Sequence, residues 1–152
     1  MSMLQLKPLK NLLPLFLLLS FMSTPLFSLG QEQEEVTHPI DVSLERCLSA
    51  DSNFTTQGMM GCYYEARQSW DLELNLQYTE LRNLLDSASF SNLQKAQRSW
   101  LSFRDKEFDY INYLYYQKNG SMWRVVASER RMDIIRTRAL ELKSYYDLLD
   151  EK

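Results

Sequence analysis

The stretch MMGCYYEARQSWDLELNLQYTELRNLL, residues 59–85, decides the fold class. Its apolar residues recur at steps of three and four positions, which places them on one stripe of an α-helix. The members of that stripe are Met59, Cys62, Tyr63, Ala66, Trp70, Leu74, Tyr78, Leu81 and Leu85. The stretch therefore predicts one long amphipathic helix that buries one side against other helices.

The segments around this helix also have helical spacing. Residues 40–48 predict a short first helix, which the turn-prone residues 51–53 end. Thr55 or Thr56 can then cap the long helix with its hydroxyl group. After the long helix, the sequence DSASFSN, residues 86–92, predicts a break that ends in a cap at Ser91 or Asn92.

Two more apolar stripes complete the chain. A third helix is expected from Leu93 to the Asn119–Gly120 pair, and Ser121 can cap a fourth. No segment has the alternating pattern of a strand, and short connections between long amphipathic helices favour antiparallel neighbours. The predicted fold is all-α: a small antiparallel bundle of three long helices plus a short N-terminal helix, over residues 40–152.

The first thirty residues predict a secretory signal peptide. Lys7 and Lys10 precede the apolar run LLPLFLLLSF, and small residues follow up to Gly30. The run is too short to cross a bilayer, so no stable membrane insertion is expected after cleavage at Gly30. Residues 31–39, QEQEEVTHP, are polar and lack periodicity, which predicts a flexible arm. The remaining protein is expected to be periplasmic or secreted.

The charge of the chain limits the choice of partner. The formal net charge is −3, and removal of the two leader lysines makes the remainder more negative. A mildly acidic surface argues against nucleic acid and favours contact with a basic partner.

Cys47 and Cys62 predict one disulfide. An even number of cysteines in an exported chain suggests pairing, and two cysteines allow only one intramolecular bridge. The bridge would tie the short first helix to the long one. Metal binding is the rival reading, but two thiols and the distant His38 do not make a site.

Polar residues on two helical stripes suggest an interhelical contact. Gln97, Trp100 and Arg104 share one face of the third helix, and Asp71 and Asn75 lie one turn apart on the second. A buried arginine needs an acceptor, because an unpaired buried charge is costly. We therefore expect a structural polar clasp in which Arg104 and Gln97 bond to Asp71 and Asn75 under the cover of Trp100.

These residues resemble a known family. Cys62, then WDLELNLQY, AQRSWLSFRD, a Gly-Ser connection and TRALEL occur in an order similar to that of the LprI-like lysozyme inhibitors, small exported bacterial proteins. The resemblance covers roughly residues 47–142. It implies an all-helical, disulfide-stabilised envelope protein and, for the member that gave the family its name, inhibition of lysozyme. Arg138 in TRALEL matches the family pattern and is a further candidate for the clasp.

One departure from the family pattern is visible. Many relatives place a Cys shortly after the Arg-Asp pair and bond it to another Cys in the last helix. This chain has Phe108 at the first position and lacks both cysteines. Packing of Phe108 against the last helix is expected to replace that tie.

The sequence offers few candidate catalytic residues. The only histidine, His38, precedes the first helix, so Ser-His and Cys-His pairs are improbable. Asp105 and Asp109 are two carboxylates that could in principle cleave glycosides, but on a helix rich in Arg and Lys such a pair is usually a solvated face. No metal-ligand spacing and no phosphate-cradling loop occur in the sequence, so we expect no enzymatic activity and no cofactor.

The sequence INYLYYQKNGSMW, residues 111–123, predicts a partner-binding tip instead. Aromatic side chains dominate interface hot spots, and not all of those in this segment can face inward. The candidate binding residues are Tyr113, Tyr116, Asn119, Gly120, Ser121 and Trp123. The alternative is that these rings pack against the surface of their own domain.

The expected function is an exported binding protein that inhibits lysozyme or a related cell-wall hydrolase by steric occlusion. The alternative is a non-catalytic envelope protein with a structural, stress-related or immunity role. A pull-down from envelope extract would separate the two.

Overall fold

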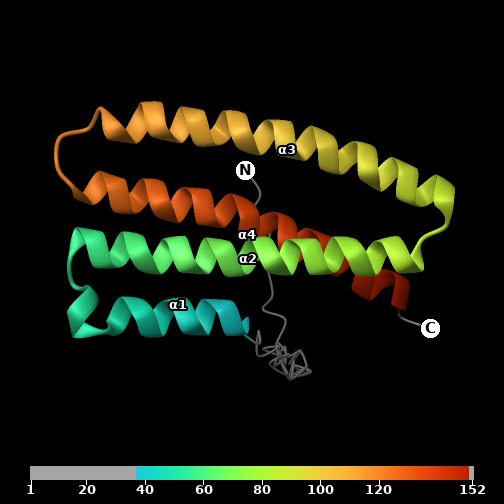
Figure 1. The fold of residues 1–152 in the computed structure, drawn as a ribbon, viewed down its shortest axis with the longest axis horizontal. Coiled ribbons are helices and arrows are strands. Elements are labelled where there is room, and N and C mark those ends of the chain that lie inside the picture. Colours follow the sequence, from blue (N-terminus) through green and yellow to red (C-terminus); the bar gives the residue numbers. More distant parts are fainter. Residues whose placement is uncertain (1–36, 151–152) are drawn as a thin grey trace, which may run out of the picture. The chain divides into compact units, whose positions relative to one another are not determined.

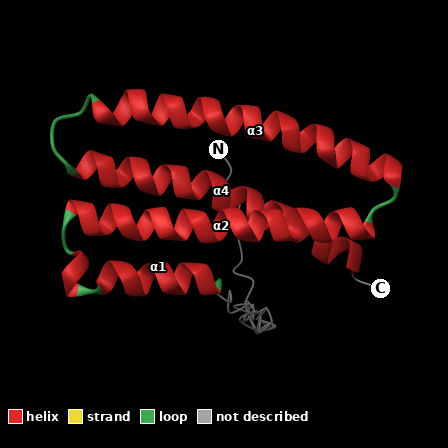
Figure 2. Cartoon of the chain, in the orientation of Figure 1, coloured by secondary structure: helices red, strands yellow, loops and turns green. Residues whose placement is uncertain are grey.

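The protein was studied as a computed structural model, which describes residues 37–150. Four α-helices and one 3-10 helix follow one another: α1 (Pro39–Ser49), η1 (Asp51–Asn53), α2 (Thr56–Leu84), α3 (Ser87–Tyr116) and α4 (Met122–Asp150). Residues 37–150 contain no strand (Figure 2), so the predicted all-α fold is confirmed. The predicted signal peptide lies outside the described residues.

The last two residues of the predicted flexible arm, His38 and Pro39, form the start of α1. Pro39 is the first residue of α1, where its fixed backbone angle suits a helix start. His38 caps this helix, because its Nδ1 accepts a hydrogen bond from the backbone N–H of Ile40 at 3.2 Å. The His38 ring also packs on Trp70, with 4.4 Å between ring centroids. Residues 31–36 of the arm lie outside the described residues.

The core forms between α2 and α4, which lie side by side (Figure 1). Trp70 of α2 and Leu142 of α4 are completely covered, as the long apolar stripe of α2 predicts. The short helix α1 packs Ile40 and Leu44 against this core. An ion pair of 2.7 Å between Asp41 and Arg136 adds a polar tie from α1 to α4.

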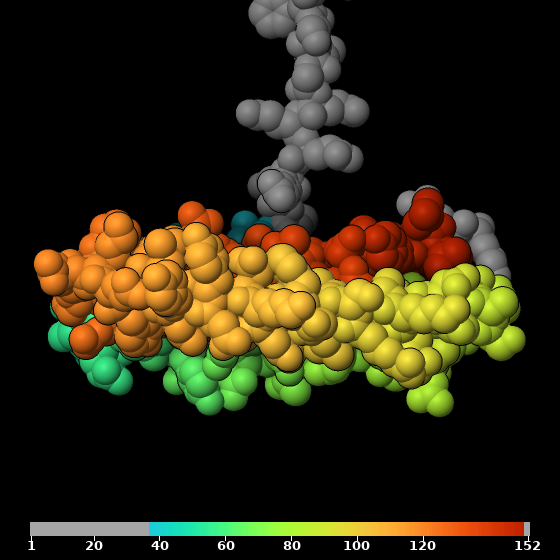
Figure 3. Space-filling model, turned by 90° about the horizontal axis from the view of Figure 1, so that it is seen from above, coloured from blue at the N-terminus to red at the C-terminus, as the bar shows by residue number. Residues whose placement is uncertain are grey.

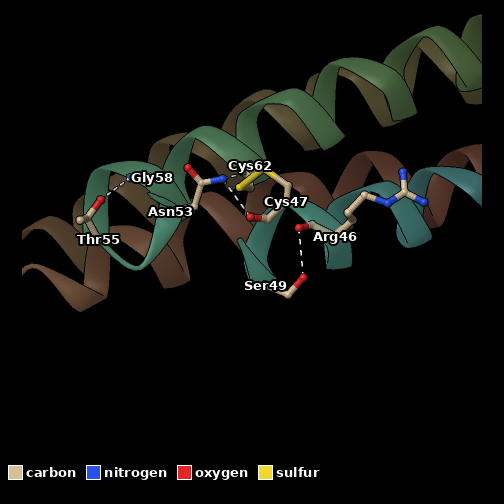
Figure 4. The surroundings of a disulfide bond; sticks show 7 residues. All are labelled: Arg46, Cys47, Ser49, Asn53, Thr55, Gly58 and Cys62. Atoms are coloured by element: carbon tan, nitrogen blue, oxygen red, sulfur yellow. Dashed lines mark hydrogen bonds between the residues drawn. A yellow bond between two sulfur atoms is a disulfide. The ribbon is translucent and has the colours of Figure 1, made fainter. Parts of the chain in front are cut away.

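The predicted disulfide between Cys47 and Cys62 is confirmed. It links the end of α1 to the start of α2 (Figure 4), and the side chain of Asn53 donates a hydrogen bond to the Cys47 carbonyl at 2.9 Å. Thr55 caps α2 as expected, since its hydroxyl accepts a hydrogen bond from the N–H of Gly58. A Cβ atom at position 58 would lie 2.6 Å from the Cα of Asn53, so this close approach requires glycine.

The predicted break over residues 86–92 is wrong, because α3 already begins at Ser87. Asp86 is the cap: its carboxylate accepts hydrogen bonds from the backbone N–H groups of Ala88 and Ser89. These bonds hold the pKa of Asp86 below its ordinary value. The aromatic ring of Phe90 then packs on Tyr78 of α2, with ring centroids 5.6 Å apart. Serine residues in the first turn therefore do not prevent helix formation when an aspartate before them caps the helix.

Helix α3 is the least buried of the long helices. Only Gln97 and Ile111 of its side chains are buried, whereas seven residues of α4 are. It lies mainly against α4, and Figure 3 shows its surface in yellow and orange in front of α4. Gly120, at φ 100°, provides the left-handed conformation that ends the connection to α4. None of the helices between residues 37 and 150 is apolar over enough of its length to cross a bilayer.

Candidate functional site

The polar clasp predicted from the sequence has different partners in the structure. The guanidinium of Arg104 bonds to the carboxylate of the next residue, Asp105, at 2.7 and 2.9 Å. The side chain of Asn75 donates to the backbone carbonyl of Asp71 within α2, at 2.7 Å. Within residues 37–150 no hydrogen bond joins Arg104 to Asp71 or Asn75, so this part of the prediction is wrong. The physical reason is that α3 packs on α4 more closely than on α2.

Arg138 of α4 forms the buried contact in place of Arg104. Its Nε donates to Oε1 of Gln97 at 2.9 Å, and the two side chains are only 7% and 8% exposed. Its Nη1 donates to Glu141 at 2.6 Å, and its guanidinium lies 5.9 Å from the ring of Trp100. Gln97 and Trp100 therefore belong to a buried polar contact, as expected, but its arginine comes from α4. The signal was visible in the sequence, since Arg138 lies on the apolar stripe between Ile135 and Leu142.

This contact changes the acidity of Glu141. Partial burial alone would raise the pKa of this carboxyl group. Hydrogen bonds from Arg138 and Tyr145 outweigh that effect and hold the pKa below its ordinary value. Glu141 is therefore a charged partner that compensates the buried guanidinium.

The five predicted clasp residues do line one space, a cleft between α2 and α3. Its volume is about 350 Å³, and its walls include Asp71, Asn75, Gln97, Trp100 and Arg104. A smaller cleft of about 220 Å³ continues along the same seam and shares Asp71 and Arg104 with the first. The sequence thus predicted which side chains face one another but not that the helices stay apart there.

A second, larger groove runs between α3 and α4. It has a volume of about 540 Å³ and is largely apolar, with Trp100, Phe103, Tyr110 and Ile134 in its walls. Asp133 lies in this groove, and partial burial raises the pKa of its carboxyl group although Arg136 and Arg130 act in the opposite direction. The sequence analysis placed Ile111, Leu114 and Tyr115 in the aromatic segment and named Trp100 and Arg138 for the polar contact, but it predicted no groove here. Exposure of a helical side chain depends on how closely its neighbour packs.

The predicted partner-binding residues gather at the turn between α3 and α4. Tyr113, Tyr116 and Trp123 are 68%, 52% and 40% exposed. Asn119 and Gly120 lie in the turn itself, and the hydroxyl of Ser121 shares a hydrogen bond of 3.0 Å with Thr56 at the start of α2. We call these six residues, from Tyr113 to Trp123, the aromatic apex. This apex lies at the same end of the molecule as the α1–α2 connection (Figure 1).

Four contacts in and around the apex were missed by the sequence analysis. The ring of Trp123 stacks on Tyr115 across the turn, with centroids 6.0 Å apart. The ammonium group of Lys118 lies 5.7 Å from the centroid of the Trp123 ring. The guanidinium of Arg131 lies 5.8 Å from the centroid of the Tyr116 ring and donates a hydrogen bond to Asn112. The rings are therefore partly packed on their own domain, as the alternative interpretation expects, and partly exposed.

More than half of the sequence matches a protein family. The family described as Lysozyme inhibitor LprI matches residues 47–142, which is more than half of the chain. The chain belongs to the LprI family. The motifs of this chain that carry the resemblance, Cys62, D-x-x-LN, Q-x-x-W and the arginine of TRALEL, lie at the disulfide, the α2/α3 cleft and the buried Gln97–Arg138 contact.

One solved structure has a similar fold. An uncharacterised protein from Burkholderia thailandensis is 30% identical, with a TM-score of 0.70 over 74% of this chain. This LprI chain spans about half of that protein, 55% of its length. No curated protein matches the chain. Phe108 is partly buried and packs against the core cluster that residues of α2 and α4 form.

Proposed function

We propose that this chain is an exported inhibitor of lysozyme or of a related cell-wall hydrolase. The family match over residues 47–142 is the observation that carries this proposal. The protein would act by steric occlusion, as a binding protein and not as an enzyme, in the periplasm or after secretion.

The aromatic apex has the properties of a surface that enters a cleft. Its exposed Tyr113, Tyr116 and Trp123 offer large contact areas at low cost in rotamer entropy. The bond between Ser121 and Thr56 and the stacking of Trp123 on Tyr115 restrain the turn before it meets a partner. A restrained binding loop loses less entropy on association, which favours affinity.

The charge of the apex suits the active site of a glycoside hydrolase. Between residues 110 and 128 the chain carries Lys118 and Arg124 and no acidic residue. Such hydrolases generally hold two carboxyl groups in the substrate cleft. Lys118, above the ring of Trp123, would face these carboxylates, whereas the net negative charge of the rest of the chain would speed encounter with a cationic enzyme.

A lysozyme turbidity assay with the purified protein tests this function directly. We expect slower clearing of a bacterial cell-wall suspension at near-stoichiometric ratios of this protein to enzyme. Unchanged clearing at a large molar excess, with several lysozymes and an unrelated muramidase, would exclude inhibition of this enzyme class.

The apolar α3/α4 groove favours a second candidate function. Its half-exposed Phe103 and Tyr110 could contact another envelope component, which fits a non-catalytic structural, stress-related or immunity protein. A pull-down from envelope extract separates the two candidates, because an inhibitor should recover a cell-wall hydrolase. The other outcome of the pull-down is recovery of other envelope proteins. If Phe103→Ser abolishes that recovery and a variant of the apex does not, the second candidate function is favoured.

A further inference from the structure

The seam between α2 and α3 concentrates positive charge in an acidic protein. Arg98 and Arg104 line the larger cleft of this seam, and Arg67 and Arg104 line the smaller one. Among the described residues that line the two clefts, Asp71 is the one acidic side chain. The whole chain has a net charge of −3, so three guanidinium groups around one carboxylate are a local reversal of charge.

Aromatic rings hold two of these guanidinium groups in place. Arg104 lies 5.6 Å from the centroid of Trp100, and Arg67 lies 5.9 Å from that of Phe108 and 5.2 Å from that of Tyr64. Stacking on a ring fixes the plane of a guanidinium but uses none of its N–H donors. Within residues 37–150 Arg67 donates no hydrogen bond, and Arg104 donates from Nε and Nη2 to Asp105. The donors of Arg67 and the Nη1 group of Arg104 therefore remain available for a ligand in the seam.

The carboxylates near these arginines are weak competitors. Arg104 is paired with Asp105, but Asp105 is 64% exposed and adjacent in the chain, and such surface pairs contribute little. Asp71 lies on the opposite wall and forms no hydrogen bond with Arg104 within residues 37–150. An anion with two or more charges that enters the seam can thus replace Asp105 at small cost.

The rest of the lining suits a polar ligand. Asn75 and Tyr78 of α2 face Gln94 of α3 across the larger cleft, and each of them can donate a hydrogen bond. The cleft volume of about 350 Å³ lies within the range of small-molecule sites. Guanidinium groups bind carboxylate and phosphate oxygens in pairs of parallel hydrogen bonds.

We propose that the cleft between α2 and α3 binds a small oxyanion with at least two negative charges, either a phosphate ester or a polycarboxylate. Arg98 and Arg104 hold its charged groups, and Asn75 and Tyr78 donate from the opposite helix. The bound anion supplies the link between α2 and α3 that the free side chains do not form. This site is separate from the aromatic apex and does not depend on the proposed inhibition of lysozyme.

Isothermal titration calorimetry with pyrophosphate and with citrate tests the proposal, at an ionic strength kept constant with chloride. We expect saturable binding of at least one probe at one site per chain, and the probe that binds shows whether the site prefers phosphate or carboxylate oxygens. The double variant Arg98→Gln/Arg104→Gln should weaken binding at least about tenfold, and Arg46→Gln, an exposed arginine of α1, should not. Asp71→Asn should tighten binding several-fold, because it removes the one carboxylate of the lining.

Three results would overturn the site. The first is no saturable heat with either probe, and the second is unchanged affinity in the double variant. The third is an equal loss in Arg46→Gln, which would indicate general attraction of anions to the surface. Circular dichroism spectra show whether each variant is folded. In Asp71→Asn the expected result is tighter binding, which loss of the fold cannot produce.

Discussion

At the scale of single residues, the arginine that carries the buried contact is Arg138 and not Arg104. Both positions could be recognised from the sequence, because each places an arginine on an apolar helical stripe. Which of them is buried depends on the distance between helices, and α3 approaches α4 along this stretch and leaves a cleft toward α2. Sequence periodicity gives the direction of a side chain but not the separation of two helices.

Removal of Gln97 should therefore destabilise the protein more than removal of Arg104. Gln97→Ala leaves the Nε of a buried guanidinium without its acceptor, which should lower the free energy of unfolding by about 2 kcal/mol. Arg104→Ala breaks a surface pair with Asp105 and should cost about 1 kcal/mol or less. Urea unfolding followed by circular dichroism gives both values. A larger loss in Arg104→Ala would contradict the assignment of the buried contact to Arg138.

Asp133 should make stability depend on pH in a defined direction. Its pKa is raised by burial, so the folded state favours the neutral carboxyl, and the charged form reduces stability above that pKa. Asp133→Asn should therefore raise the melting temperature at pH 7. The gain should shrink as the pH falls through the pKa of Asp133, where the wild-type group becomes neutral as well. A gain that stays constant down to pH 3, or a loss at pH 7, would show that attraction to Arg130 and Arg136 outweighs burial.

At the scale of helices, the sequence predicted each element but not every boundary. The stripe over residues 59–85 predicted α2 almost to its last residue, and Thr55 was rightly expected as its cap. The start of α3 was placed six residues too late, because Ser, Asn and Asp favour turns as well as helix caps. Tertiary contacts favour the helical conformation of this segment, since the ring of Phe90 packs on Tyr78 of α2.

The disulfide should be the strongest single constraint on the α1–α2 unit. It encloses a sequence separation of 15 residues, for which the loss of chain entropy in the unfolded state corresponds to about 3 kcal/mol. The double variant Cys47→Ser/Cys62→Ser should lower the free energy of unfolding by that amount in urea. Addition of a thiol reductant should destabilise the wild-type protein and leave the variant unchanged. A difference below about 1 kcal/mol would indicate that Ile40 and Leu44 hold α1 in place without the bond.

At the scale of the whole molecule, the described helices differ in how much they contribute to the core. Helices α1, α2 and α4 share the core, whereas α3 is held by few buried side chains and borders clefts on both of its sides. The aromatic apex was predicted from composition alone, because many rings in one short segment cannot all be buried. The α2/α3 seam and the α3/α4 groove could not be predicted, since they result from the spacing of α3 relative to both neighbouring helices.

Lysozyme inhibition by the wild-type protein and by the double variant Tyr116→Ala/Trp123→Ala is the most direct test of this account. We predict inhibition by the wild type, and at least about 30-fold weaker inhibition by the variant with the same helical circular dichroism, because hot-spot aromatic residues contribute most of the binding energy. Tyr64→Ala, which removes a similarly exposed tyrosine from α2, should inhibit as the wild type does. Equal inhibition by the double variant and the wild type, or a loss of inhibition that follows a loss of helicity, would contradict the assignment of partner binding to the apex.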